Sequence, residues 1–165
     1  MLYLDGARYL LQQQTNEEKL ESMVKEHSKE IFGETSVYFD LKHKLTSKAG
    51  AGSIPDAYVV DFVQPYKWYI VEVELAAHST DHHIMPQLNK FLRGISRAES
   101  QNIVSKAMHN ELEKKEDLKT FVKANIGSSE IHRALSEIVS SSPSLVVVID
   151  EATEEFLESV EDFKK

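Results

Sequence analysis

Apolar residues in this chain follow two periodicities, which separate helical segments from strands. From residue 16 to residue 32, and again from residue 84 to residue 95, they recur every three or four positions, the spacing of one face of an α-helix. The faces expected to be buried are Leu20, Met23, Val24, His27 and Ile31 in the first helix and Ile84, Leu88, Phe91, Leu92 and Ile95 in the second.

Other apolar residues stand in consecutive runs rich in β-branched and aromatic side chains, as is typical of buried strands. The sequence predicts strands at 37–42, 57–63, 67–75 and 145–149, and the last is the strongest prediction of a buried strand. Gln64-Pro65-Tyr66 separates the second strand from the third, so these two strands are expected to form a hairpin.

Polar residues mark the expected helix ends. Thr15 and Glu18 have the spacing of a capping box, and Gly33 is expected to end the first helix. The second helix is expected to begin near Asp81 or Pro86.

Four further segments complete the prediction. Residues 44–53 contain two glycines and predict a mobile loop. Residues 96–125 are polar and helix-prone, which predicts a solvated helix or helical hairpin inserted into the fold. Residues 128–139 predict a short amphipathic helix, and Asp150 is expected to cap a closing helix.

This order of elements predicts an α/β fold with a mixed central sheet flanked by helices. At 165 residues the chain fits one domain, 1–165, and its 41% hydrophobic and 28% charged residues are ordinary for a globular protein. The absence of cysteine excludes disulfides, thiolate zinc sites and cysteine nucleophiles. No apolar run reaches the roughly 18 residues of a membrane span, and the first residues lack a signal-peptide core, so a cytoplasmic location without membrane contact is expected.

Three carboxylates belong to the predicted hairpin. Asp56 stands immediately before its first strand, and Glu72 and Glu74 lie within the otherwise apolar second strand. A simple antiparallel register places Glu74 opposite Ala57, so Asp56 is expected to lie beside Glu74. Buried carboxylates are costly unless they are compensated, and a divalent cation with oxygen ligands is one such compensation. The alternative is a partly exposed edge strand whose glutamates point to solvent.

Asp56 after Ile54-Pro55, the Glu72-Val73-Glu74 triplet and a following helix with Gln87 together resemble the signature of the PD-(D/E)XK, or restriction-endonuclease-like, nuclease superfamily. The resemblance covers residues 16–101 and the strand at 145–149. It implies an αβββαβ core with a helical insertion around 96–125. It also implies an endo- or exonuclease in which Asp56 and Glu72 bind Mg²⁺ or Mn²⁺.

The resemblance also implies the rest of the catalytic set. Glu74 stands where the superfamily usually has lysine, and a carboxylate could serve there as general base or metal ligand but not as a cationic stabiliser. Gln87 would support the site, although it also fits an ordinary surface glutamine. A glutamate of the first helix would complete the metal site, with Glu17 as first choice and Glu21 as reserve.

Three histidines, His78, His82 and His83, follow the acidic strand. The four-residue spacing of His78 and His82 would place both on one helix face as zinc ligands, with His83, Asp81 or Glu74 as the third. Alternatively, the histidines line a substrate groove with His78 near a phosphate, or they begin a helix and have no function.

Basic residues flank the acidic region on both sides. Lys42, His43, Lys44 and Lys48 precede Asp56, and Lys90, Arg93 and Arg97 follow on the second helix. The residues predicted to bind nucleic acid are Lys44, Lys48, His78, Lys90 and Arg93. The same charges also fit a solvated surface, and the net charge of −8 argues against a protein that coats nucleic acid non-specifically.

The leading hypothesis is a Mg²⁺- or Mn²⁺-dependent nuclease that acts on nucleic acid, with DNA as the expected substrate and a homodimer or a larger protein assembly as the expected association state. The alternative is a non-catalytic binding module that keeps the nuclease fold within a larger assembly. A histidine-based zinc hydrolase is the third hypothesis.

Overall fold

A four-stranded sheet lies at the centre of the protein in the computed structural model, which describes residues 2–4, 7–9, 16–42, 44–46, 52–127 and 130–163. Its strands are β3 (Ser36–Phe39), β6 (Ala57–Asp61), β7 (Lys67–Glu74) and β8 (Ser144–Ile149), in the order β3-β6-β7-β8. The first two pairings are antiparallel and β7 pairs with β8 in parallel, so the sheet is mixed. Two short antiparallel pairs are β1 (Leu2–Leu4) with β2 (Ala7–Tyr9) and β4 (Leu45–Thr46) with β5 (Gly52–Ser53).

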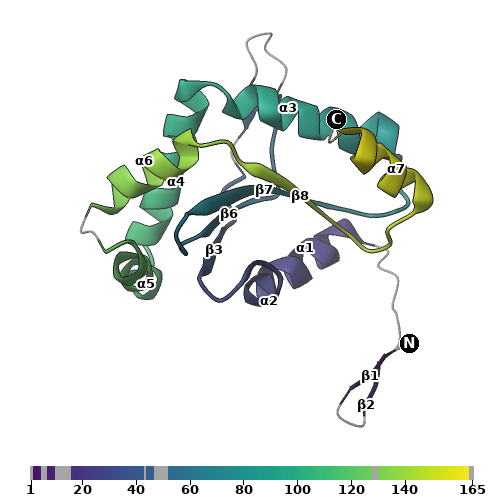
Figure 1. Cartoon of the computed structure of the whole chain (residues 1–165), viewed down its shortest axis with the longest axis horizontal. Coiled ribbons are helices and arrows are strands. Elements are labelled where there is room, and N and C mark those ends of the chain that lie inside the picture. The colour runs from purple at the N-terminus through teal and green to yellow at the C-terminus, as the bar shows by residue number, and fades with distance from the viewer. Residues whose placement is uncertain are drawn as a thin grey trace.

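Helices cover both faces of this sheet, which gives the α/β class that the sequence predicted (Figure 1). The helices are α1 (Glu17–Glu26), α2 (Ser28–Phe32), the π-helix η1 (Thr80–Ile84), α3 (Met85–Ile95), α4 (Ala98–Glu113), α5 (Glu116–Ile126), α6 (Ile131–Ser140) and α7 (Glu154–Phe163). Figure 1 shows α1 and α2 on one side of the sheet and α3, α4, α6 and α7 on the other. No helix of the described residues combines the length and the apolar character needed to cross a bilayer.

Strand β7 is buried on both faces, because each face of the sheet carries its own hydrophobic core. Trp68 and Ile70 belong to the larger core, which the sheet forms with α3, α4 and α6. Val71 and Val73 belong to the smaller core, which packs against Val24 and its neighbours on α1. The prediction that this run is buried on both faces is confirmed.

The predicted helix 16–32 is wrong in one respect, because it is interrupted at His27 and forms α1 and α2. Leu20 and Val24 are buried as predicted, whereas Met23, His27 and Ile31 are exposed. The predicted buried face assumes one continuous helix. Because the helix is interrupted at His27, the residues of α2 no longer follow the spacing of α1, and Ile31 does not continue its buried face.

Two helix caps differ from the prediction. Asn16 caps α1 by accepting a hydrogen bond from the Lys19 amide at 3.1 Å, and Thr15 lies outside the described residues. At α7 the capping hydroxyl belongs to Thr153, which accepts a hydrogen bond from a backbone amide of the first turn at 3.2 Å. Asp150 does not cap α7, and its side chain instead accepts a hydrogen bond from the Ala76 amide in the turn after β7.

The hairpin register also differs from the prediction. Ala57 pairs with Val71 and not with Glu74, a shift of three residues. Strand β6 ends at Asp61, and buried Phe62 belongs to the connection, so five residues (62–66) join the strands instead of a tight turn. An odd shift exchanges the two faces of a strand, so this difference decides which side chains meet.

The two outer strands differ from the prediction in length and burial. Strand β3 ends at Phe39, three residues before the predicted end at Lys42. Strand β8 forms as predicted at one edge of the four-stranded sheet, but it is half-buried. The predicted loop 44–53 contains the short pair β4 and β5, and residues 47–51 lie outside the described part of the chain.

The segment predicted as a solvated insertion is helical but not solvated. It forms α4 and α5, and Val104, Met108 and Leu112 of α4 are fully buried in the larger core. On α3 the predicted face is buried except for Leu92, which is exposed. The helix predicted at 128–139 forms as α6 and is described from residue 130 onward.

Gly94 of α3 provides a test of this packing. A Cβ atom at this position would lie 2.8 Å from the Leu45 Cβ on β4. Glycine-to-alanine changes inside helices usually stabilise by about 0.5–1 kcal/mol. Gly94→Ala is instead expected to lower the free energy of unfolding by about 1–3 kcal/mol, because β4 would have to move. The control Lys90→Ala on the exposed face of α3 should change it by less than about 0.5 kcal/mol. Chemical denaturation measures both, and a stabilised Gly94→Ala would contradict the contact.

Candidate metal centre

Acidic side chains gather at the end of the sheet where β6 begins and β7 ends. Asp56 directly precedes β6, and Glu72 and Glu74 are among the last three residues of β7. In the observed register the last pair is Ala57 with Val71, and the next residues beyond it are Asp56 and Glu72. Asp56 therefore lies beside Glu72, and its expected place beside Glu74 is wrong because of the register shift.

Asp56 is held in this place by the backbone of the neighbouring strand. Its Oδ2 accepts a hydrogen bond from the Val73 amide at 2.8 Å, and its side chain is 14% exposed. One carboxylate oxygen therefore fixes the side chain against β7, while the other oxygen, Oδ1, accepts a hydrogen bond from Lys42.

Glu72 is the carboxylate with the least compensation. It is 3% exposed, and its Oε1 accepts a hydrogen bond from the Gln87 side-chain amide on α3. Its Oε2 is buried and has no hydrogen-bond partner among the described residues. Buried polar atoms are nearly always paired, so this oxygen needs an explanation. A cation bound at Oε2 would provide one.

Burial raises the pKa of Glu72 to about 9, and the nearby carboxylates of Asp56, Glu74 and Glu17 add to this effect. In the absence of a cation the side chain is therefore protonated at neutral pH. A divalent cation would reverse this preference, because a nearby positive charge favours the ionised carboxylate. The residues present thus fit a metal ion with oxygen ligands.

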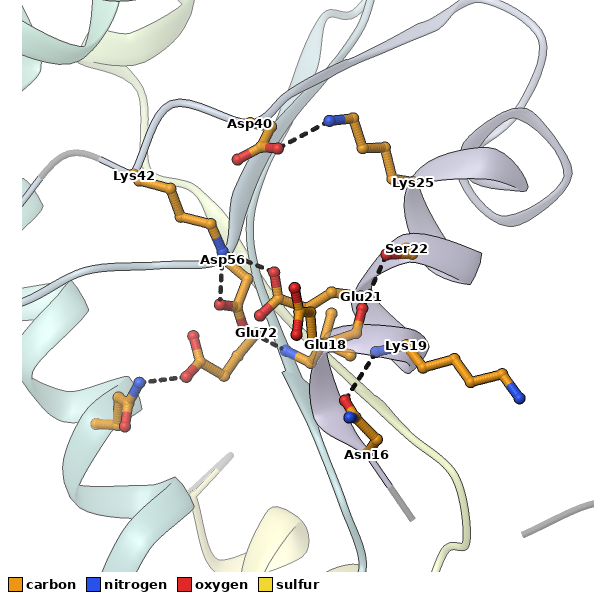
Figure 2. Close-up of polar contacts among 12 residues, drawn as sticks. Asn16, Glu18, Lys19, Glu21, Ser22, Lys25, Asp40, Lys42, Asp56 and Glu72 are labelled. Atoms are coloured by element: carbon orange, nitrogen blue, oxygen red, sulfur yellow. Dashed lines mark hydrogen bonds and ion pairs between the residues drawn. The ribbon is translucent and has the colours of Figure 1, made fainter. Parts of the chain in front are cut away.

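Lys42 reaches the acidic residues from the chain that follows β3 (Figure 2). Its Nζ donates to Glu21 Oε2 at 2.7 Å and to Asp56 Oδ1 at 3.1 Å. Burial alone would lower the pKa of Lys42, but these two carboxylates outweigh it and the net pKa is raised. Lys42 has φ +47°, an uncommon value for a residue with a side chain.

Lys42 belongs to the basic residues expected to flank the acidic region, but it was not among the residues predicted to bind nucleic acid or metal. The sequence predicted that Lys42 is the last residue of a strand. In a regular strand, side chains point alternately to the two faces of the sheet, and this alternation would have set the direction of the Lys42 side chain. The left-handed backbone turns it toward Asp56 instead, and the basic cluster at 42–48 was the only signal in the sequence.

The two candidate glutamates of α1 make different contacts. Glu17 Oε2 lies 3.5 Å from His78 Nδ1, whereas Glu21 binds Lys42. Glu17 also acts electrostatically on Glu72. The structure therefore places both the first choice and the reserve at the centre, with Glu17 nearer the histidines.

Glu74, His78 and His83 form a second group beside the first. Glu74 is 1% exposed, and its Oε2 lies 2.6 Å from His78 Nδ1 while its Oε1 lies 3.1 Å from His83 Nε2. The hydrogen bond to Glu74 raises the pKa of His78. One ligand atom from each of the three residues lies within 4.8 Å of the others, so this group could hold a metal ion.

The predicted pairing of His78 with His82 is wrong, because His83 is the partner of His78. His78 lies in the turn after β7 and not on a helix, and the Ala76 amide in this turn donates to Asp150 Oδ1 at 2.7 Å. The histidines that follow lie on η1, whose π-helical turn holds more residues than an α-turn. An i, i+4 count on an α-helix cannot anticipate this geometry.

The residues predicted to bind nucleic acid do not gather around the acidic residues. Lys44, Lys90 and Arg93 are exposed, and no contact within the described part of the chain joins them to the acidic residues. Lys48 lies outside the described residues. Of the predicted set, His78 is the member that reaches the metal centre.

No protein-family model matches this chain, and no match was found among curated proteins or among solved structures. The resemblance to the restriction-endonuclease-like superfamily therefore depends on the residues and their arrangement alone.

The raised pKa of Glu72 predicts how pH affects the metal-free protein. Between the unfolded value of 4.5 and the folded value of about 9, the folded state binds the extra proton. Stability should therefore fall as pH rises through this window, by at most about 1.4 kcal/mol per pH unit. With a chelator present, Glu72→Gln should remove this slope and raise the melting temperature at pH 8.

The control for this experiment is Glu26→Gln, an exposed glutamate at the end of α1 that should keep the wild-type slope. Melting temperatures from pH 5 to pH 8 measure the effect in all three proteins. A wild type and a Glu72→Gln variant with parallel curves would show that Glu72 is ionised when the metal is absent.

Proposed function

We propose that this protein is a Mg²⁺- or Mn²⁺-dependent nuclease that hydrolyses phosphodiester bonds of nucleic acid, with DNA as the expected substrate. The observation that carries the proposal is the buried, unpartnered Oε2 of Glu72 beside Asp56. The element order α1, β3, β6, β7, α3, β8 supports a restriction-endonuclease-like core, because it follows the αβββαβ succession.

Asp56 and Glu72 are the residues that would hold the ion. When bound, the ion supplies Lewis acidity that polarises a phosphate oxygen and lowers the pKa of a water molecule. Gln87 holds Glu72 Oε1, which leaves Oε2 for the cation. Gln87 is therefore a positioning residue in this proposal, and its place on α3 links the site to the larger core.

Lys42 supplies the positive charge that the triplet lacks. With Glu74 at the usual lysine position, the triplet itself offers no cation for the phosphate. Lys42 Nζ already lies at the acidic residues and neutralises Asp56 and Glu21. Held between Glu21 and Asp56, this ammonium would be the cation available to contact an oxygen of a phosphate bound at these carboxylates.

Glu74 is assigned to metal binding and not to general base catalysis. Both of its oxygens face histidine nitrogens, at 2.6 Å for His78 and 3.1 Å for His83. A general base needs an oxygen that is within hydrogen-bond reach of the attacking water. Exposed Lys44, Lys90 and Arg93 would contact the nucleic-acid backbone away from the reacting phosphate.

The second candidate function is a nuclease-fold module that binds nucleic acid or a larger assembly without cleaving. Glu74 at the lysine position and the net charge of −8 favour it. A measurement can separate this module from a nuclease, because the module would bind nucleic acid or its partner without cleaving a phosphodiester bond.

Activity is the direct test. With Mn²⁺ the wild type should cleave at least one of four substrates (duplex DNA, single-stranded DNA, branched DNA and RNA), and Asp56→Asn or Glu72→Gln should abolish cleavage. Lys42→Met should lower kcat by about 10- to 1,000-fold, because it removes a charge that stabilises the transition state. Glu26→Gln is the control. Tight binding without cleavage of any of the four would favour the module, and the nuclease proposal would then be wrong.

Thermal stability tests metal binding separately from turnover. At a hundredfold excess of Mn²⁺ over its Kd, the folded state should gain about 2.7 kcal/mol. Asp56→Asn should lose this gain, and Glu26→Gln should keep it. Differential scanning calorimetry with and without Mn²⁺ measures the gain, and an equal melting temperature in both conditions would count against the carboxylate site.

A further inference from the structure

We propose that Glu74, His78 and His83 form a second metal site, which binds one first-row transition-metal ion of the Zn²⁺ class. This site is distinct from the oxygen-ligand site at Asp56 and Glu72. Its existence does not depend on the proposed nuclease activity, because metal binding can be measured without a substrate.

The ligand atoms determine the class of metal. Two imidazole nitrogens and one carboxylate oxygen form the ligand set of several catalytic zinc sites, in which water or substrate takes the fourth position. Imidazole suits zinc, copper, nickel and iron, whereas Mg²⁺ prefers oxygen ligands and keeps several waters. The Glu74 group therefore favours a transition metal, and the Asp56–Glu72 group favours Mg²⁺ or Mn²⁺.

The distances are compatible with this ligand set. Metal–ligand bonds of about 2.0–2.1 Å place tetrahedral ligand atoms about 3.3 Å apart. The closest nitrogen–oxygen distances are 2.6 Å for His78 and 3.1 Å for His83, and the three ligand atoms lie within 4.8 Å of one another. Small rotations of two exposed imidazole rings would admit an ion.

The site combines a rigid base with an open side. Glu74 is buried at the end of the central strand, whereas the side chains of His78 and His83 are 40% and 55% exposed. The Asp150 carboxylate holds the turn that carries His78. A site built in this way can keep a coordination position for water, which a closed structural zinc site cannot.

A second observation next to the group also indicates a cation. Glu72 lies two residues from Glu74 on the same face of β7, and its buried Oε2 has no partner among the described residues. Glu17 faces His78 at 3.5 Å and acts electrostatically on Glu72. The two sites are thus adjacent, and the arrangement fits a centre with two different ions.

His82 offers a matched control, because it is an exposed histidine on η1 that does not belong to the group. Isothermal titration with Zn²⁺ should give one high-affinity site in the wild type. His78→Ala and His83→Ala should each weaken it by more than about 10-fold, since even outer-shell changes cost 10- to 100-fold. His82→Ala and Asp56→Asn should keep wild-type affinity.

Imidazole NMR signals of the unmodified protein provide a test that needs no variant. One equivalent of Zn²⁺ should shift the ring signals of His78 and His83 and leave those of His82, His109 and His132 in place. The same concentration of Mg²⁺ should leave the signals of His82, His109 and His132 in place and should not reproduce the Zn²⁺-dependent shift of His83. Co²⁺ bound at this site should give the visible absorption of a tetrahedral ion.

Three results would overturn the proposal: no stoichiometric Zn²⁺ binding, an equal loss of affinity in His82→Ala and His83→Ala, or unshifted signals for His78 and His83. Loss of Zn²⁺ binding in Asp56→Asn would overturn the separation into two sites. None of these results would decide the nuclease proposal, which is tested by Mn²⁺-dependent cleavage.

Discussion

The burial of two carboxylates in the central strand β7 is the constraint on which this end of the molecule depends. Glu72 and Glu74 lie on the same face of a strand that is packed on both sides, where an uncompensated charge costs several kcal/mol. Three side chains from other segments bind these two carboxylates. Gln87 of α3 donates to Glu72, and His78 of the turn after β7 and His83 of η1 lie against the two oxygens of Glu74.

The two carboxylates are compensated to different degrees, although they are only two residues apart. Both oxygens of Glu74 meet histidine nitrogens, whereas Glu72 has one partner and is held neutral by its raised pKa. Their ligand chemistry differs for the same reason. Glu74 shares its environment with nitrogen ligands, and Glu72 shares its environment with the oxygens of Asp56, so neighbouring positions of one strand favour different ions.

The acidic character of the whole chain does not conflict with the proposed binding of a phosphate. The net charge of −8 includes carboxylates that a bound cation would neutralise locally. Helix α1 also contributes, because its first turn carries Glu17 at the end where the helix dipole is positive. That dipole favours the local acidic charge, and Lys42 adds a positive charge between Glu21 and Asp56.

The sequence by itself determined the α/β class, the buried face of α3 apart from Leu92 and the antiparallel pairing of the hairpin strands, since these follow from local periodicity and short separations along the chain. The family resemblance, and not the periodicity, placed Gln87 near the acidic strand. The tertiary structure decided the register of the hairpin, the inward turn of Lys42 and the pairing of His78 with His83. These features depend on how many residues a connection uses, on one left-handed backbone angle and on a π-helical turn. Each is selected by packing against distant segments, and a pattern read along a single stretch of chain carries no information about such contacts.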